Sequence, residues 1–402
     1  MSNRASAPSW PKTVTVGRPW RQTVRGGSRD DRMLSEISVS LPPRISKLDV
    51  PLTSALAVEL ESTVLEIAAL DTSSGEVLDA LGVLLLRTES VASSKIERIQ
   101  AGIDDYARAL HGVKSNPAAV SMVAATQALA IMIDQVARTR SITAETITDA
   151  HTALMADEAG ERDYAGRLRG MQNWIGGSNF SPRGALYIPP PPDTVPAYMA
   201  DLLEFSNRED LPALVQAAIA HAQFESIHPF TDGNGRIGRG LINSILRRRQ
   251  ITTRVVVPLA SALVAHRDRY FDLLTAYREG EVGPIVRSFA VSTRIAAHES
   301  RRTAARLGEL PTEWRALVGP VRSDSAAGRL LGHLLVQPIL SAEGAQELMG
   351  TSASATYAAI ERLHHSGVLR PLTARTRNQV WGASLVLEEL DDLGVRIARA
   401  AR

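Results

Sequence analysis

The chain has 402 residues, of which 44% are hydrophobic and 4% aromatic, and its formal net charge is only +2. This length suits two or three domains with sizeable cores, and the near-neutral charge excludes a molecule that binds polyanions over its whole surface. Because the sequence has no cysteine, disulfide bonds, cysteine-ligated zinc and thiol chemistry are excluded.

Residues 1–45 are predicted to form a basic, partly disordered arm. They are rich in Pro, Gly, Ser and Arg and show no hydrophobic periodicity. A solvated arm is the simpler interpretation, and an arm that contacts nucleic acid or an acidic partner is the alternative. The segment lacks the apolar core of a secretory signal, and the most apolar run, residues 81–86, is far too short to span a membrane. We therefore expect a cytoplasmic protein with no membrane partner.

Residues 46–140 are predicted to form an N-terminal helical region. Leu56, Leu60 and Ile67 fall on one helical stripe, which residues 71–75 interrupt. Further helices are expected near residues 78–85, 103–110 and 120–136.

Residues 141–320 are expected to form the central domain. Its first helix, residues 143–155, begins with a capping signature in Thr143 and Thr146. Glycines and four consecutive prolines in residues 160–196 predict loops and a β-hairpin. Helices are expected again at residues 211–227, 234–249, 270–277 and 284–306.

One segment of this domain, His228 to Arg239, reads HPFTDGNGRIGR and lies between two predicted helices. Gly233 and Gly235 permit positive φ and close backbone approach, so the Gly-Asn-Gly amides at the helix start would form an anion-binding nest. Arg236 lies three residues before the final arginine, so both guanidinium groups can face a di- or triphosphate held there.

A base and a metal ligand accompany this phosphate cradle. Asp232 at its rim suits Mg²⁺, which takes one or two carboxylates together with phosphate oxygens. His228 can take a proton from an attacking hydroxyl. These are the parts that phosphoryl or nucleotidyl transfer requires, because positioning and charge stabilisation dominate such reactions.

The segment resembles the signature of the Fic family, His-Pro-Phe-x-Asp/Glu-Gly-Asn-Gly-Arg-x-x-Arg, at every fixed position. The resemblance implies a mainly α fold, with a Fic-type helical core and a β-hairpin flap. It also implies transfer of AMP from ATP, with Mg²⁺ as cofactor, to a Ser, Thr or Tyr hydroxyl of a target protein. By this resemblance His228 is the general base, Asp232 the Mg²⁺ ligand and Phe230 a buried anchor. The residues assigned to the phosphates are Gly233, Asn234, Gly235, Arg236 and Arg239.

Residues 172–177 and 185–190 are similar to the flap of these enzymes. An exposed hairpin edge can pair with an extended target segment and hold its hydroxyl near the base. A hairpin that only closes the core is the alternative.

Tyr270 and Arg278 occupy places where relatives often contact the nucleotide, although aromatic residues at helical spacing usually belong to the core. His221 is expected to be a core histidine or one that supports the site from behind, and no role is assigned to His151.

A built-in brake is predicted within residues 88–98. The run from Ser93 to Glu97 resembles the inhibitory motif of Fic proteins, Ser/Thr-x-x-x-Glu followed by Gly or Asn. In the class with an N-terminal inhibitory helix, this glutamate pairs with the second arginine of the signature, here Arg239. An acid in that place blocks productive placement of ATP. Arg98 stands where Gly or Asn is usual, so the helix need not end there. An ordinary exposed glutamate is the alternative.

Residues 325–395 are predicted to form a C-terminal winged helix-turn-helix domain. The pattern is helix, helix, turn, helix and two short strands, with the turn at Gly350 and a wing that holds Arg375 and Arg377. Such domains bind DNA or proteins, and both partners stay open. The side chains expected to reach DNA are Ser352, Ser354 and Thr356.

The sequence therefore favours a protein adenylyltransferase that acts on protein substrates and on itself and is restrained by Glu97. One alternative is a winged-helix DNA-binding regulator whose Fic core senses nucleotide. Another is a Fic enzyme that uses a different nucleotide donor or removes AMP. Intact His228 and Asp232 favour the enzyme, because a sensor needs no base. A homodimer is compatible with the resemblance, and the target protein is not identified.

Overall fold

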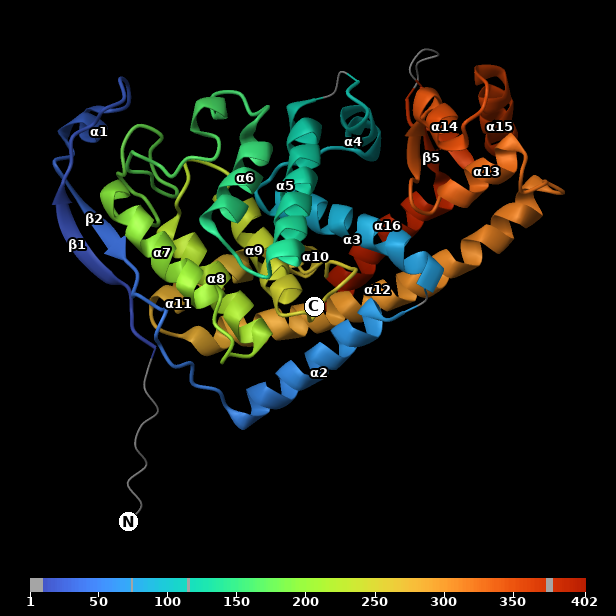
Figure 1. Ribbon diagram of the computed structural model, residues 1–402. Helices are drawn as coiled ribbons and strands as arrows, with labels where there is room; N and C mark the ends of the chain where they lie inside the picture. Colours follow the sequence, from blue (N-terminus) through green and yellow to red (C-terminus); the bar gives the residue numbers. More distant parts are fainter. Residues whose placement is uncertain (1–9, 74, 114–115, 374–378) are drawn as a thin grey trace. The chain divides into compact units, whose positions relative to one another are not determined.

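The computed structural model describes residues 10–73, 75–113, 116–373 and 379–402. Over these residues the protein is mainly α-helical, with a two-stranded and a three-stranded antiparallel sheet (Figure 1). The chain divides into two compact units. Their segments are Met1–Glu61, Ile131–Gln250 and Arg267–Ala290 in the first, and Ser62–Ala130, Ile251–His266 and Val291–Arg402 in the second.

The first unit contains the helices that flank the HPFTDGNGRIGR segment. Helices α2, α5 and α12 contribute residues to both units because the unit boundaries fall within them. The elements are β1 (Val14–Pro19), α1 (Arg29–Met33), β2 (Glu36–Leu41), α2 (Ser54–Asp71), α5 (Pro117–Thr139), α6 (Ala144–Met155), the 3₁₀ turns Arg162–Tyr164 and Pro192–Thr194, α7 (Val195–Ser206), α8 (Ala213–Ile227), α9 (Asn234–Arg248), α11 (Arg267–Arg278) and α12 (Val282–Val318).

The N-terminal segment is more regular than the sequence indicates. β1 and β2 pair antiparallel, with Val16 opposite Val39, and Trp10 is buried against Tyr277 with ring centroids 6.0 Å apart. The expectation of an irregular arm is therefore wrong for residues 14–41. β2 does alternate, with Ile37 and Val39 buried and the serine between them exposed, but β1 is largely exposed and the flanking Pro, Gly and Arg residues are typical of a loop.

Helix α8 forms the centre of the first unit. Every residue from Ala213 to Ile227 is buried, and the polar residues of this helix gather on no single face. Gly238 on α9 allows α9 to approach it closely, because a Cβ atom there would come within 2.8 Å of the Glu225 Oε1 atom. The segment between α8 and α9 is thus joined to a rigid core at both ends.

Helix α5 is, among the described residues, the one helix long and apolar enough to cross a membrane by length and composition. The expectation that no segment has this property is wrong. However, 61% of its most apolar window is buried in the protein, and core helices pass the same test. The expected helix, residues 120–136, is shorter than the observed Pro117–Thr139, which reaches the length of a membrane span.

The second unit is helical apart from a small sheet. Helix α3 is longer than its predicted stripe and ends at Ile96. The elements wholly within this unit are α3 (Gly75–Ile96), α4 (Ile103–Leu110), α10 (Ala260–Ala265), α13 (Ala326–His333), β3 (Ile339–Ser341), α14 (Ala342–Met349), α15 (Ala353–His365), β4 (Leu369–Pro371), β5 (Val380–Ala383) and α16 (Ser384–Ala400).

The C-terminal elements follow the predicted order, with additions. The strand order is β3-β5-β4, and Gly350 turns between α14 and α15 with φ 58°. Arg375 and Arg377 lie outside the described residues. Thr356, expected to reach DNA, is buried and its hydroxyl donates to the Ser352 carbonyl, so that expectation is wrong. Ser352 itself caps α15 through the Ala355 N–H.

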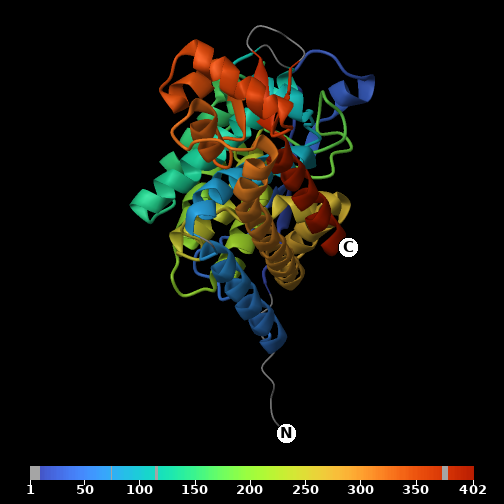
Figure 2. The ribbon, with the colours of Figure 1, turned by 90° about the vertical axis from the view of Figure 1, so that its right-hand side faces the viewer.

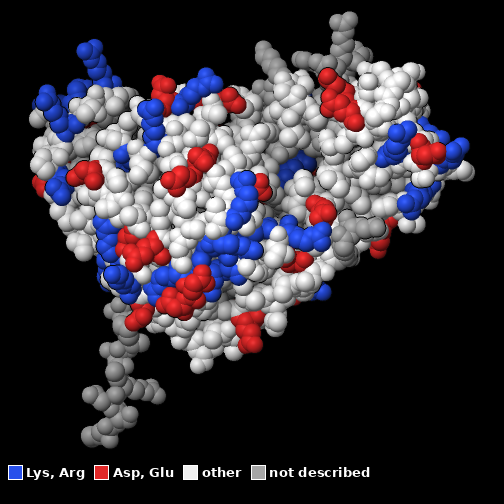
Figure 3. All heavy atoms as spheres, viewed as in Figure 1, with Lys and Arg blue, Asp and Glu red and all other residues white. Residues whose placement is uncertain are grey.

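The last helix, α16, lies alongside the later part of α12 (Figure 2). Arg396 of α16 joins them: its Nε donates to Glu299 of α12 at 3.0 Å, and its Nη2 donates to Glu389 of its own helix at 2.7 Å. On the face shown in Figure 3, basic and acidic side chains are interspersed, which agrees with the small net charge.

Candidate active site

The loop between α8 and α9 begins and ends with left-handed backbone. His228 caps α8 with φ 50° and ψ 63°, an uncommon conformation for a residue with a Cβ atom. Gly233 caps α9 with φ 73°, and a Cβ atom there would come within 2.6 Å of the Met155 side chain. Glycine is therefore required at Gly233. Gly235 lies inside α9, so the expectation of positive φ holds only for the first glycine.

The side chain of Asn234 locks this loop. Its oxygen accepts the Phe230 N–H at 2.8 Å and its nitrogen donates to the Phe230 carbonyl at 2.9 Å. Asn173 donates to the same carbonyl at 3.0 Å. Phe230 is fully buried, as its predicted anchor role requires. The Asn234 side chain thus fixes the shape of the loop, and the backbone amides at the α9 N-terminus are the groups that could receive an anion.

His151 of α6 supports the loop from below. Its ring stacks on Phe230 with centroids 3.7 Å apart and an angle of 7° between the planes. Its Nδ1 accepts the Gly166 N–H at 2.9 Å, which leaves Nε2–H to donate to the Asp232 carbonyl at 3.1 Å. The bond from Gly166 needs the neutral imidazole, because a protonated Nδ1 cannot accept, and burial lowers the pKa of His151 to about 4.

Arg169 holds the backbone of the candidate base. Its Nε donates to the His228 carbonyl at 2.8 Å, and its Nη2 donates to the Pro190 carbonyl at 2.6 Å. Its backbone N–H also donates to the Pro229 carbonyl at 2.9 Å. The side chain is buried, and this burial lowers the pKa of Arg169 to about 10. One planar guanidinium group therefore ties the left-handed residue at the end of α8 to the end of the flap.

The charged groups of the signature cluster at the α9 N-terminus. The Asp232 side chain is 56% exposed, and its Oδ1 accepts the Gly233 N–H at 2.6 Å. Arg236 lies 3.8 Å from the other carboxylate oxygen and is buried apart from 7% of its surface. An accessible carboxylate, Asp232, therefore lies beside a buried guanidinium group, Arg236.

Arg239 is buried more deeply, with 1% exposed, and its guanidinium donates to the Tyr270 hydroxyl at 3.4 Å. Tyr270 is itself 2% exposed, and its hydroxyl lies 2.9 Å from Nε2 of His221. The structure thus places the proposed nucleotide-wall tyrosine in the core, where it orients Arg239. His221 occupies the core position that its sequence context indicates.

The flap residues meet in one antiparallel bridge, Ile175 with Tyr187. Leu186 beside the bridge is 86% exposed, so part of this edge is accessible. The Tyr187 hydroxyl donates to the Ser226 carbonyl of α8 at 2.7 Å, and the Arg278 guanidinium lies 3.7 Å from its ring centre. Arg278 therefore anchors the flap.

The N-terminal hairpin braces the flap from outside. The Ser40 N–H donates to the Ile188 carbonyl at 2.8 Å, and the rings of Trp20 and Trp174 meet edge to face 5.8 Å apart. This contact was not predicted from the sequence.

The predicted inhibitory segment, residues 88–98, forms the C-terminal end of α3 in the second unit. The Arg98 N–H donates to the Lys95 carbonyl at 3.0 Å, and the Ile99 N–H donates to the Ser94 carbonyl at 3.1 Å. This pair of bonds is a Schellman motif, in which Glu97 is the C-cap and the next residue takes the left-handed conformation. Arg98 does so, with φ 62°. The helix therefore ends where it would with Gly, and Glu97 is exposed while Ser93 is buried.

Two positioning residues, His151 and Arg169, have no role in the sequence interpretation. A signal existed for His151, because it shares a helical face with Ile147 and Leu154 and should therefore be buried. For Arg169 there was none, because it lies in a glycine-rich loop without periodicity.

Comparison with known proteins gives one family match and several relatives. The model of the Fic/DOC family matches residues 141–246. A probable protein adenylyltransferase of Aquifex aeolicus is 38% identical over 104 residues, which are 26% of this chain and 29% of that protein. A protein adenylyltransferase Fic of Culex quinquefasciatus is 32% identical over 131 residues, 32% of this chain and 23% of that protein. The chain thus spans less than a third of these relatives' length.

Solved structures extend the similarity of fold. A Fic family protein from Desulfovibrio desulfuricans G20 superposes with a TM-score of 0.52 at 22% identity, over 83% of this chain and 97% of that one. A Fic domain containing signaling protein from Bacteroides thetaiotaomicron gives a TM-score of 0.51 at 19% identity, over 62% and 97%. At this identity the likeness concerns the fold alone.

Proposed function

We propose that this chain, which carries a Fic/DOC domain at residues 141–246, is a protein adenylyltransferase that moves AMP from ATP to a protein hydroxyl. The loop between α8 and α9 is the observation that carries the proposal. It gathers a base with a fixed backbone, an accessible carboxylate and two buried arginines at a helix N-terminus. The adenylyltransferase names of the relatives support it.

In the proposed reaction, His228 takes the proton of the target hydroxyl. The hydroxyl oxygen forms a bond to the α-phosphorus of ATP, the bond from that phosphorus to the β-phosphate oxygen breaks, and pyrophosphate leaves. Arg236 and Arg239 offset the charge of the departing phosphates, and the N–H groups that begin α9 hold them in place. Tyr270 keeps the second arginine oriented.

Mg²⁺ belongs to this proposal, with Asp232 as its protein ligand. Within the described residues no group of three or more His, Asp or Glu side chains gathers as a metal cage. A site built from one exposed carboxylate and phosphate oxygens fits that arrangement, because Mg²⁺ keeps several waters and takes few protein ligands. The bound ion would neutralise phosphate charge. We expect EDTA to abolish AMP transfer and excess Mg²⁺ to restore it.

We also propose that Glu97 restrains the enzyme. The Schellman motif at the end of α3 fixes the backbone position of this exposed glutamate. Its carboxylate would pair with Arg239 in place of a phosphate group of ATP. Wild type is then weakly active, and Glu97→Gly is more active.

Self-labelling with ATP labelled at the α-phosphate tests both statements. Wild type, Glu97→Gly and Glu97→Gly with His228→Ala are compared in Mg²⁺. Label that rises with the first change and disappears with the second supports His228-dependent AMP transfer under a Glu97 brake. Equal labelling of wild type and Glu97→Gly contradicts the brake. No label in any variant contradicts the proposed activity.

The remaining partners are proposals of the same kind. We place the protein in the cytoplasm, with a homodimer and self-modification as expected states. DNA is proposed as a partner of residues 325–395, where Ser354 is exposed on α15. Retarded migration of a DNA duplex that is lost at high salt supports this proposal, and unchanged migration contradicts it.

A further inference from the structure

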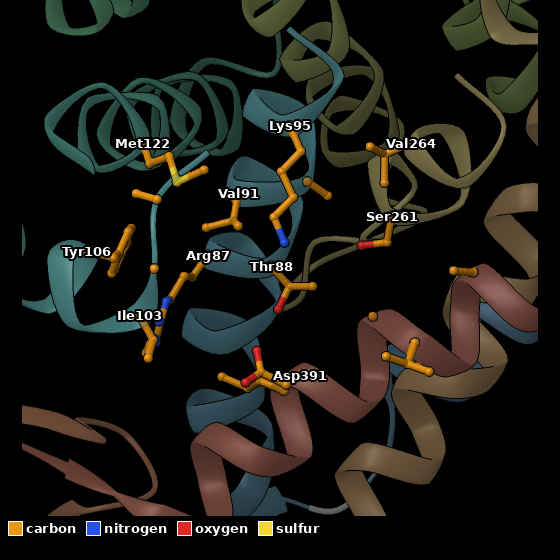
Figure 4. Close-up of a pocket in the computed structure, with 17 residues that line it drawn as sticks. Arg87, Thr88, Val91, Lys95, Ile103, Tyr106, Met122, Ser261, Val264 and Asp391 are labelled. Atoms are coloured by element: carbon orange, nitrogen blue, oxygen red, sulfur yellow. The ribbon is translucent and has the colours of Figure 1, made fainter. Parts of the chain in front are cut away.

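A pocket of about 420 Å³ lies within the second unit, against one side of α3 (Figure 4). Its volume falls in the range of roughly 300–1,000 Å³ that small-molecule sites occupy. Helices α3, α4, α5, α10 and α16 supply its walls. The residues used below are Arg87, Thr88, Val91, Lys95, Ile103, Tyr106, Met122, Ser261, Asp391 and Gly394.

The polar end of the pocket faces α10. Lys95 and Thr88 extend from α3 on the side of Ser261, whose hydroxyl points toward them (Figure 4). The Thr88 hydroxyl donates its proton to the Leu84 carbonyl, so its free lone pairs can accept from the Lys95 ammonium but not from an anion. In the described part of the chain, the Lys95 ammonium has no acceptor within hydrogen-bond distance and no ion-pair partner. A cation and hydroxyl groups thus converge on one place.

The other end is apolar and contains a second cation. Val91, Ile103 and Met122 line it. Arg87 lies 4.5 Å from the Tyr106 ring centre, and burial lowers the pKa of Arg87. The described residues offer its guanidinium no ion pair and no hydrogen bond.

Asp391 balances only part of this charge. It attracts Arg87 electrostatically from α16. One acid against two cations leaves a net positive charge of one, concentrated at Lys95. A mainly apolar pocket with one cation, the exposed Lys95, at its polar end suits a small amphipathic anion.

We propose that this pocket binds a small molecule with an apolar chain and one anionic group, either a carboxylate or a phosphate ester. The anionic group lies between the Lys95 ammonium and the Ser261 hydroxyl, which can both donate to it. The chain lies against Val91 and Met122. The pocket is separate from the signature loop, because its lining residues all belong to the second unit.

Calorimetry with octanoate and octyl phosphate, each below its aggregation limit, tests the binding. Octanol and octylammonium are the uncharged and cationic comparisons, and the two anions distinguish carboxylate from phosphate sources. Lys95→Met should weaken the anions about tenfold or more and remove their advantage over octanol, because it deletes a charge-assisted bond. Failure of both anions to bind, or equal binding of octanol, overturns the proposal.

Gly394 offers a matched pair of variants for locating the bound molecule. A Cβ atom at Gly394 on α16 meets nothing within 4 Å, so larger side chains can enter the pocket without a clash. Gly394→Leu should abolish binding, whereas Gly394→Ala should keep it and fold at least as well, because alanine favours the helix. Excess ATP should not displace octanoate. Binding that survives Gly394→Leu, or that ATP displaces, shows another site and overturns the assignment.

The position of the pocket suggests a regulatory role, and this extension rests on the proposed function. The carbonyl of Lys95 accepts the Arg98 N–H that ends α3 at Glu97. A bound anion therefore steadies the turn that presents the brake. Octanoate should lower self-labelling of wild type and leave Glu97→Gly unchanged. An equal effect on both proteins overturns the coupling. Calorimetry tests binding separately, so inactive protein would not obscure that result.

Discussion

His151 shows how one buried side chain can fix a catalytic loop. Its two ring nitrogens bond to the backbone of Gly166 and Asp232, and its ring supports Phe230. His151→Phe preserves the stacked ring and loses both hydrogen bonds. We expect it to lower the free energy of unfolding by about 1–3 kcal/mol in urea unfolding, because the Gly166 N–H and the Asp232 carbonyl lose their bonds to a buried ring. A change below measurement error would contradict this account of the loop.

The same residue makes stability depend on pH. The folded-state pKa of His151 is about 4, whereas the unfolded side chain titrates near its ordinary value of 6.5. Between these values the unfolded chain binds more protons, so stability falls as the pH drops through this window. The loss approaches roughly 3 kcal/mol at its acid end. Urea unfolding from pH 7 to pH 4 should show this slope in wild type and a smaller one in His151→Phe.

Arg169 is a positioning residue for His228, because it bonds the backbone of the candidate base without touching the reacting atoms. Arg169→Lys keeps the charge and loses the planar fork. We expect AMP transfer to fall about ten- to a hundredfold in kcat, with little change in KM for ATP. The exposed Arg167→Lys is the matched control. A rise in KM alone would place Arg169 in nucleotide binding instead.

At the scale of the element, the end of α3 carries backbone strain. Arg98 holds φ 62°, a conformation that costs a residue with a Cβ atom roughly 1–2 kcal/mol. Arg98→Gly should stabilise the protein by about 1 kcal/mol, and the β-branched Arg98→Val should destabilise it. Thermal unfolding of the two variants measures both signs. Destabilisation by glycine would contradict the assigned helix end.

The elements also show what could be predicted from the sequence. Periodicity and capping residues predicted α6 with its Thr143 cap. The segment HPFTDGNGRIGR, through its resemblance to the Fic signature, predicted the loop before α9. Helix α10 was missed because it is short and its burial depends on distant segments, and the β1–β2 hairpin was missed because the alternation of β2 stands among Gly, Pro and Arg residues typical of loops. The roles of His151 and Arg169 were missed for the same reason, since their partners lie on other elements.

At the scale of the whole molecule, α16 closes the chain against α12 within the second unit. Arg396 joins Glu299 and Glu389 there, and all three side chains are mostly buried. Arg396→Met should cost about 2–4 kcal/mol, because it leaves the mostly buried Glu389 without its cation, whereas Glu299 keeps Arg302 at 3.0 Å. Arg399→Met, at an exposed position on the same helix, should change stability little. Equal urea midpoints for the two variants would contradict this role.

The measurement that tests the central claim most directly is self-labelling of Glu97→Gly with ATP labelled at either the α- or the γ-phosphate. AMP transfer through His228 predicts label from the α-phosphate only, and no label once His228→Ala is added. Label from the γ-phosphate, or α-label that survives His228→Ala, would contradict the account.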